Sequence, residues 1–117
     1  MVSPISAEVV LARLDPDERR WVTELRDQLR AMLGLGPRLR DLRLFGSQVR
    51  GDDHEESDID ILVVIDDVDG PTRWQITDAA HISPWLAPVI EDYERYHAPI
   101  NRAGGFYKEL RRESVRL

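Results

Sequence analysis

The sequence predicts an α+β domain in which helices pack against one small β-sheet. Three observations lead to this prediction: a capped amphipathic helix over residues 16–33, a polar–apolar alternation at Asp41–Leu44, and the apolar run Ile61–Ile65. The chain has 117 residues, the size of one domain, and 42% hydrophobic and 32% charged residues can supply a core and its surface. Along this single domain, 1–117, we expect N-terminal helices over 1–35, a sheet core with the candidate site over 40–92, and a helical tail over 93–117.

Helix signals dominate the first part of the chain. Residues Ser6–Leu14 are weakly helical. Asp15 can cap a helix that begins at Pro16, and Glu18 completes a capping box. Apolar residues then recur at helical spacing as far as Leu33, where glycines and a proline follow. The pattern predicts one long helix with its apolar face on a sheet.

Strand signals follow. Asp41–Leu44 alternates polar and apolar residues, which is typical of a half-buried strand. From Asp58 the run DIDILVVI is almost wholly apolar after its first three residues, which predicts a central strand covered on both faces. A third strand within 81–90 contains two prolines, which cannot donate to a ladder, so we place it at an edge. Further short helices are expected over 72–80, 93–96 and 105–113.

Composition excludes several function classes. The chain contains no cysteine, which rules out disulfide scaffolds, cysteine-ligated zinc and thiolate catalysis. Its 22 acidic and 16 basic residues give a net charge of −6, which argues against general nucleic-acid binding. We see neither a signal-peptide pattern nor an apolar run of the ~18 residues that a membrane span needs. We therefore expect a cytoplasmic protein that binds no membrane.

Asp58 and Asp60 lie two residues apart at the start of the predicted central strand. Side chains two apart on a strand point to the same face, so the two carboxylates project together. Mg²⁺ prefers such oxygen ligands and is usually held by one or two carboxylates together with substrate phosphates. A solvated strand entrance is the simpler explanation, but two unpaired acids beside an apolar strand are costly to bury. The pair therefore predicts a site for a Mg²⁺-bound nucleotide.

Gly46 and Ser47 follow the preceding strand. Glycine lets the backbone turn tightly and approach a phosphate, whose oxygens free N–H groups and the serine hydroxyl can bind. Arg50 lies about one helical turn later and can pair with a phosphate or with the acidic pair. A surface salt bridge to Asp52 or Asp53 explains Arg50 equally well.

The spacing of these two motifs is more specific than either motif alone, because ten residues separate Ser47 from Asp58. The arrangement resembles the Gly-Ser, ten residues, Asp-x-Asp motif of the DNA polymerase β-like nucleotidyltransferases. Arg50-Gly51 and Ser57 match their small prokaryotic members, the minimal nucleotidyltransferases that are often paired with HEPN-type toxins. The resemblance implies the polymerase β-like palm fold, a mixed sheet flanked by helices, and transfer of AMP from ATP.

The resemblance also assigns roles to residues. It implies that Asp58 and Asp60 are catalytic and hold one or two Mg²⁺ ions, and that the nucleotide is bound by Gly46, Ser47, Arg50 and Ser57. The family commonly has a third carboxylate on a later strand, but the matching residues here, 85–90, contain no acid. Glu91 is our candidate for this third catalytic carboxylate, and Asp92 is the other choice. A group supplied by a partner protein, or a loss of catalytic activity, would equally account for the missing third carboxylate.

The implied activity is Mg²⁺-dependent transfer of AMP from ATP to a hydroxyl of a partner toxin, which would make this protein an antitoxin in a hetero-oligomer with a HEPN-type toxin. An alternative is a transferase fold that neutralises its partner by binding alone. A transferase acting on a small molecule such as an antibiotic is less favoured. Trp74 and Trp85 can pack against an adenine, although a core or partner contact accounts for them equally well.

Overall fold

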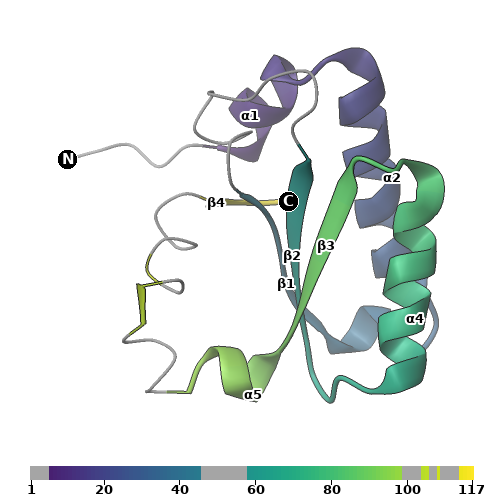
Figure 1. Ribbon diagram of the computed structural model, residues 1–117, viewed down its shortest axis with the longest axis vertical. Coiled ribbons are helices and arrows are strands. Elements are labelled where there is room, and N and C mark those ends of the chain that lie inside the picture. Colours follow the sequence, from purple (N-terminus) through teal and green to yellow (C-terminus); the bar gives the residue numbers. More distant parts are fainter. Residues whose placement is uncertain (1–5, 46–57, 99–103, 106–107, 109–113) are drawn as a thin grey trace.

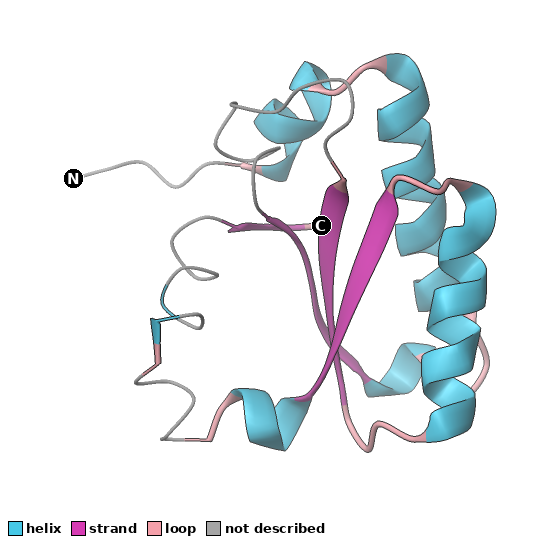
Figure 2. Cartoon of the chain, viewed as in Figure 1, coloured by secondary structure: helices cyan, strands magenta, loops and turns pink. Residues whose placement is uncertain are grey.

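Four strands form one mixed sheet in the order β3-β2-β1-β4 (Figures 1 and 2). The structure is a computed structural model that describes residues 6–45, 58–98, 104–105, 108 and 114–117. The strands are β1 (Leu39–Phe45), β2 (Ile59–Ile65), β3 (Leu86–Asp92) and β4 (Ser114–Arg116). β1 is antiparallel to both β2 and β4, whereas β3 runs parallel to β2. The predicted α+β class with a mixed sheet is confirmed.

Helices cover mainly one face of this sheet. They are α1 (Ala7–Arg13), α2 (Pro16–Ala31), α4 (Gly70–Ala79) and α5 (Tyr93–Tyr96), with the short 3₁₀ helices η1 (Gly36–Arg38) and η2 (Ala80–Ile82). Figure 1 shows α2 and α4 side by side on one face, while α5 continues directly from the end of β3. The helices expected over 72–80 and 93–96 are therefore present.

The start of α2 follows the predicted capping box. The Glu18 backbone N–H donates to Asp15 Oδ1 at 2.9 Å, and the Asp15 N–H donates to Glu18 Oε1 at 3.2 Å. These reciprocal bonds satisfy N–H groups that a helix start leaves unpaired. The helix ends at Ala31, two residues before the predicted Leu33, and Gly34 nearby adopts a φ of +79°. That left-handed conformation suits glycine, which has no Cβ.

β2 is the central strand, as predicted, and its residues are buried on both faces except Asp60. Ile59 and Ile61 belong to the larger core, which lies between the sheet and the helices. Leu62 belongs to a second, smaller cluster with Tyr96 of α5. Because side chains alternate along a strand, the two clusters mark the two faces of the sheet. We call the face with the smaller cluster the α5 face.

β3 lies at an edge of the sheet, as its prolines predicted. It starts at Leu86 rather than near His81, because residues 80–82 form the 3₁₀ helix η2. Pro88 within it pairs in register with Ile61 of β2. The connection from α4 to β3 is therefore short. It places Leu86, the first residue of β3, beside Ile59, the first residue of β2.

β4 was not predicted, since we expected a helical tail over 93–117. Val115 pairs with Leu44 of β1 and is 2% exposed, so it completes the larger core. On the α5 face, the Asp41 carboxylate binds Arg43 at 2.8 Å and Arg116 at 3.2 Å. The pair with Arg116 joins β4 to β1, whereas the pair with Arg43 lies within β1. Most of the helix expected over 105–113 lies outside the described residues.

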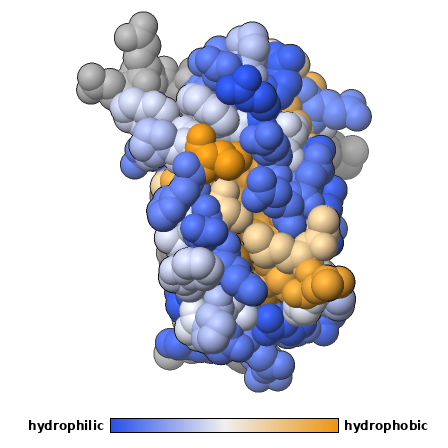
Figure 3. Space-filling model, turned by 90° about the vertical axis from the view of Figure 1, so that its right-hand side faces the viewer, coloured by the Kyte–Doolittle hydropathy of each residue, from blue (hydrophilic) through white to orange (hydrophobic). Residues whose placement is uncertain are grey.

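The outward surface of α2 and α4 is mostly hydrophilic, with a band of apolar side chains in its middle (Figure 3). Leu33 after α2 and Trp74 on α4 are 98% and 67% exposed. Within the described part of the chain, no helix combines the length and apolar character needed to cross a membrane.

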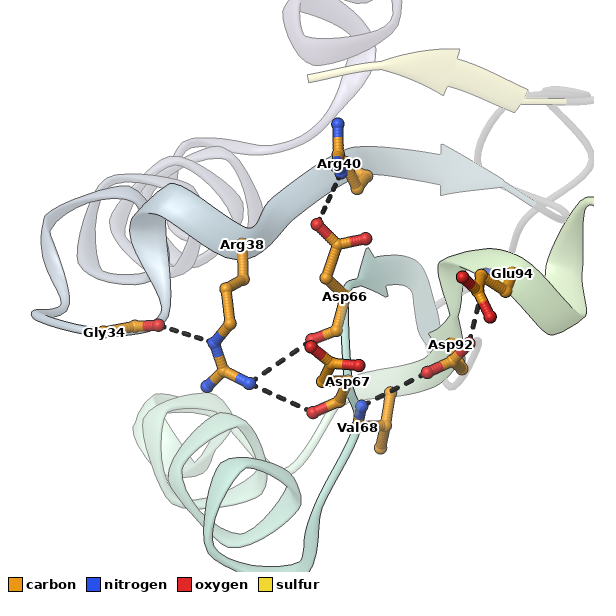
Figure 4. Close-up of polar contacts among 8 residues, drawn as sticks. All are labelled: Gly34, Arg38, Arg40, Asp66, Asp67, Val68, Asp92 and Glu94. Atoms are coloured by element: carbon orange, nitrogen blue, oxygen red, sulfur yellow. Dashed lines mark hydrogen bonds and ion pairs between the residues drawn. The ribbon is translucent and has the colours of Figure 1, made fainter.

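Arg38 joins three segments at the end of β2 (Figure 4). Its Nε donates to the Gly34 carbonyl oxygen at 2.6 Å, and its Nη1 donates to the carbonyl oxygens of Asp66 and Asp67 at 3.3 and 3.0 Å. Its Nη2 donates to the hydroxyl of Thr72, which is 2% exposed, at 2.9 Å. One guanidinium therefore satisfies acceptors in the turn between β2 and α4.

We expect Arg38→Ala to lower the free energy of unfolding by about 2 kcal/mol, because it removes four hydrogen bonds, two of them to partly buried acceptors. Urea denaturation followed by circular dichroism measures this loss. Arg20→Ala is the matched control: the Arg20 side chain is 62% exposed and pairs with Asp17 at 3.4 Å, so its loss should stay below ~0.5 kcal/mol. Equal losses for the two variants would contradict the role assigned to Arg38.

Candidate active site

The end of β1 meets the starts of β2 and β3 at one end of the sheet, the upper end in Figure 1. Phe45, the last residue of β1, pairs with Asp60 of β2. Ile59 of β2 pairs with Leu86, the first residue of β3. Three chain segments that enter or leave the sheet therefore converge beside Asp60. We call this region the Asp60 end of the sheet.

Asp58 and Asp60 both belong to the Asp60 end. Asp58 is exposed and immediately precedes β2, while Asp60 is half-buried on its second residue. Ile59 and Ile61 point into the larger core, so alternation directs Asp60 to the α5 face. Asp58 lies one residue before the strand, and its predicted position on the same face stays a prediction.

This donor set fits a hard divalent cation that also binds phosphate. Two carboxylates at the solvent-accessible start of a strand supply oxygen ligands and leave room for ligands from a substrate. Within the described residues, no group of three or more histidine, cysteine, aspartate or glutamate side chains comes together as a metal site. A cation at Asp58 and Asp60 would therefore take further ligands from elsewhere, and nucleotide phosphates are suitable donors.

The other predicted nucleotide-binding residues cannot be placed in this geometry. Gly46, Ser47, Arg50 and Ser57 all lie outside the described residues. The chain does leave β1 directly before Gly46 and enters β2 two residues after Ser57, so their segment starts and finishes at the Asp60 end. Their roles in nucleotide binding stay predictions.

Glu91 lies on β3 but away from the Asp60 end. The register pairs Asp60 with Ala87 and Val64 with Glu91. Four residues along a strand correspond to about 13 Å, which exceeds the separation at which two carboxylates share one cation. The structure therefore does not bring Glu91 together with Asp60. The position on β3 beside Asp60 is occupied by Ala87, which has no ligand atom in its side chain.

Asp92, the other candidate for a third acid, supports the chain at the far end of the sheet (Figure 4). Its Oδ2 accepts from the Val68 backbone N–H at 3.3 Å, and its Oδ1 accepts from the N–H groups of Glu94 and Arg95 at 3.1 and 3.4 Å. The bond from Val68 is the main cause that lowers the pKa of Asp92, while burial opposes it. Asp92 thus caps α5 and holds the loop after β2.

A separate hollow of about 160 Å³ lies near the junction of β1 and β4 and is lined by three arginines among other residues. Each arginine already has an acceptor. Arg30 donates to the Leu117 carbonyl oxygen at 2.6 Å, Arg40 pairs with Asp66 at 2.7 Å, and Arg116 pairs with Asp41. All three guanidinium groups are therefore already engaged within the fold, and the Asp60 end, with its two carboxylates, stays the better candidate for a metal-bound nucleotide.

Residues 22–102 match the family model described as "Nucleotidyltransferase domain". The chain belongs to this nucleotidyltransferase family. The match covers β1, β2 and β3 and thus the whole Asp60 end. The resemblance to polymerase β-like nucleotidyltransferases, predicted from the Gly-Ser and Asp-x-Asp motifs, is confirmed.

Two solved structures share the nucleotidyltransferase fold of this chain. One is a candidate nucleotidyltransferase from Sulfolobus solfataricus, with 22% identity, a TM-score of 0.50, and coverage of 99% of this chain and 89% of the other. The second is a chain of a toxin–antitoxin complex with AMP-PNP, with 23% identity, a TM-score of 0.56, and coverage of 81% and 70%. No significant match is found among curated proteins. At these identities the likeness shows the fold.

The capping role of Asp92 predicts a pH effect on stability. Because its pKa is lower in the folded than in the unfolded chain, the ionised carboxylate stabilises the fold above the unfolded pKa. That contribution is lost as the pH falls through the folded pKa. We expect Asp92→Asn to lower Tm at pH 7 and to lose less Tm than the unsubstituted protein between about pH 4 and pH 2.

Thermal unfolding at a series of pH values tests this expectation. Asp78→Asn is the control, since Asp78 lies on α4 with a side chain 62% exposed, and its Tm at pH 7 should be nearly unchanged. Parallel pH profiles for Asp92→Asn and the unsubstituted protein would refute the stabilising role of the Asp92 carboxylate.

Proposed function

We propose that this nucleotidyltransferase is a Mg²⁺-dependent adenylyltransferase that moves AMP from ATP to a hydroxyl group of a partner protein. The observation that carries the proposal is the position of Asp60 on β2, with Asp58 directly before it, where β1 ends and β2 and β3 begin. This carboxylate pair lies within a domain of the nucleotidyltransferase family. Paired acids at such an edge suit binding of a metal-bound triphosphate.

In the proposed site, Asp58 and Asp60 hold the cation and thereby position the triphosphate. Mg²⁺ bound there would neutralise phosphate charge and help to orient the attacking hydroxyl in line with the departing pyrophosphate. Gly46 and Ser47 would donate backbone and hydroxyl hydrogen bonds to phosphate oxygens, and Arg50 and Ser57 would add further contacts. The chain itself would contribute mainly by positioning the triphosphate and by electrostatic interactions with its phosphate groups.

For the acceptor, we propose a tyrosine hydroxyl of a HEPN-type toxin in the cytoplasm, with this protein as its antitoxin. Support comes from the similar fold of a chain in a toxin–antitoxin complex with AMP-PNP and from the match of the Gly-Ser and Asp-x-Asp spacing to minimal nucleotidyltransferases. The fold likeness alone does not identify a partner. The proposal therefore depends on the transfer experiment.

A second candidate function is neutralisation of the partner by binding without catalysis. One observation favours it: the residue of β3 beside Asp60 is Ala87, so this strand supplies no third carboxylate at that position. The two candidates differ in whether the Asp58 and Asp60 carboxylates are needed. Catalysis requires both carboxylates, whereas a binding surface tolerates their replacement by the nearly isosteric amides of asparagine.

We expect the double substitution Asp58→Asn, Asp60→Asn to reduce transfer of labelled AMP to the partner by at least about 100-fold, since changes to outer-shell partners of metal ligands alone cost 10–100-fold. The assay combines the purified protein, Mg²⁺, ATP labelled in the α-phosphate and the product of the neighbouring gene. The control Asp17→Asn, Asp27→Asn removes the same charge from exposed positions of α2 and should keep full activity.

The same variants separate the two candidate functions. Loss of both label transfer and neutralisation, with complex formation intact, supports the adenylyltransferase. Neutralisation that persists in the Asp58→Asn, Asp60→Asn variant, without label on the partner, supports binding alone. Equal labelling by the variant and the unsubstituted protein would eliminate the proposed site.

The register also predicts how β3 contributes. We expect Ala87→Asp to tighten Mg²⁺ binding in the presence of ATP by about tenfold, because it adds a carboxylate beside Asp60. Glu91→Gln should change Mg²⁺ binding less than twofold, since Glu91 lies about 13 Å along the strand. Calorimetric titration with Mg²⁺ measures both effects. A larger loss of Mg²⁺ affinity for Glu91→Gln than for Asp60→Asn would instead support Glu91 as the third carboxylate.

A further inference from the structure

Trp85 is held at the Asp60 end by its backbone. Its N–H donates to Ser83 Oγ at 3.1 Å, and its carbonyl oxygen accepts from the Ile59 N–H at 2.7 Å. Ser83 is 2% exposed, so the turn that carries Trp85 is anchored in the protein interior. The bond from Ile59 continues the β2–β3 ladder one residue before the start of β3.

The same ladder brings the backbone of Trp85 close to the acidic pair. Ile59 pairs with Leu86 and Asp60 with Ala87, and the Trp85 carbonyl oxygen accepts from Ile59, the residue between Asp58 and Asp60. Leu86 points into the larger core, and alternation therefore directs Ala87 of β3 to the α5 face, which Asp60 shares. Trp85 lies in the turn directly before Leu86.

Exposure separates Trp85 from the residues of both apolar clusters. It is 38% exposed, and neither cluster includes it. A single exposed aromatic residue needs no functional explanation, so the exposure of Trp85 alone does not indicate a binding site. What matters is that the backbone of this partly exposed tryptophan is bonded to Ile59, the residue between the two carboxylates that would hold a metal-bound triphosphate.

We propose that Trp85 contacts the nucleobase of the bound nucleoside triphosphate and so contributes to the affinity for nucleoside triphosphates over bare polyphosphate. This inference rests on the proposed function, because it takes the triphosphate to lie at Asp58 and Asp60. A planar indole offers a face for stacking to any base. Trp85 is then a binding residue that distinguishes a nucleotide from its phosphate chain.

Calorimetric titration of the purified protein with Mg²⁺-ATP and with Mg²⁺-tripolyphosphate tests the proposal, because only ATP carries a base. We expect Trp85→Ala to weaken ATP binding about tenfold and to leave tripolyphosphate binding within about twofold. Trp85→Phe keeps an aromatic face and should retain most of the affinity for ATP. Trp74→Ala is the matched control, because Trp74 lies on α4, a helix that packs against the larger core on the opposite face of the sheet through Ile76. The Trp74 side chain is exposed, and this variant should bind both ligands normally.

The two ligands also distinguish failure of this inference from failure of the proposed function. If Trp85→Ala binds ATP as tightly as the unsubstituted protein does, the base contact is wrong and the metal–triphosphate site stands. If both ligands weaken equally, Trp85 supports the structure of the site and contacts no base. If the unsubstituted protein binds neither ligand in a Mg²⁺-dependent way, the proposed function fails and this inference fails with it.

Discussion

The parallel register between β2 and β3 determines which side chains lie around Asp60. It depends on the burial of β2, whose apolar side chains contact both clusters, and on a bond of 2.7 Å from Ile59 N–H to the Trp85 carbonyl oxygen. A shift of one residue would turn Leu86 out of the core, so alternative registers are strongly disfavoured. Consequently Ala87 neighbours Asp60, and Glu91 lies beside Val64.

Features set by neighbouring residues were predictable from the sequence. The capping box of Asp15 and Glu18 requires residues three apart and formed as expected. The apolar run Ile61–Ile65 predicted a strand buried on both faces, and prolines placed β3 at an edge. β4 was missed because its three residues carry little pattern of their own. Its stability comes from pairing with β1, some 70 residues earlier, and from the ion pair of Asp41 with Arg116.

In the candidate site, too, the features set by neighbouring residues were predictable and those set by tertiary pairing were not. The predicted shared face of Asp58 and Asp60 follows from the two-residue period of a strand, and the burial of Ile59 and Ile61 agrees with it for Asp60. The position of Glu91 relative to them could not follow from local pattern. It depends on where the connection from α4 ends, which is fixed by η2 and the buried Ser83. The sequence pattern predicted the two acids at the start of β2, but only the pairing of β2 with β3 shows which residues of β3 lie nearby.

The acidic charge of the chain, −6, is consistent with a nucleotide ligand when the two ends of the sheet are considered separately. At the far end, Asp66 pairs with Arg40 at 2.7 Å and Asp92 accepts three backbone N–H groups, so these carboxylates are used by the fold. At the Asp60 end, the proposed partner of the acids is a divalent cation. In the proposed site a small triphosphate that arrives with Mg²⁺ would be attracted, whereas a long polyanion would meet the net negative charge of the chain.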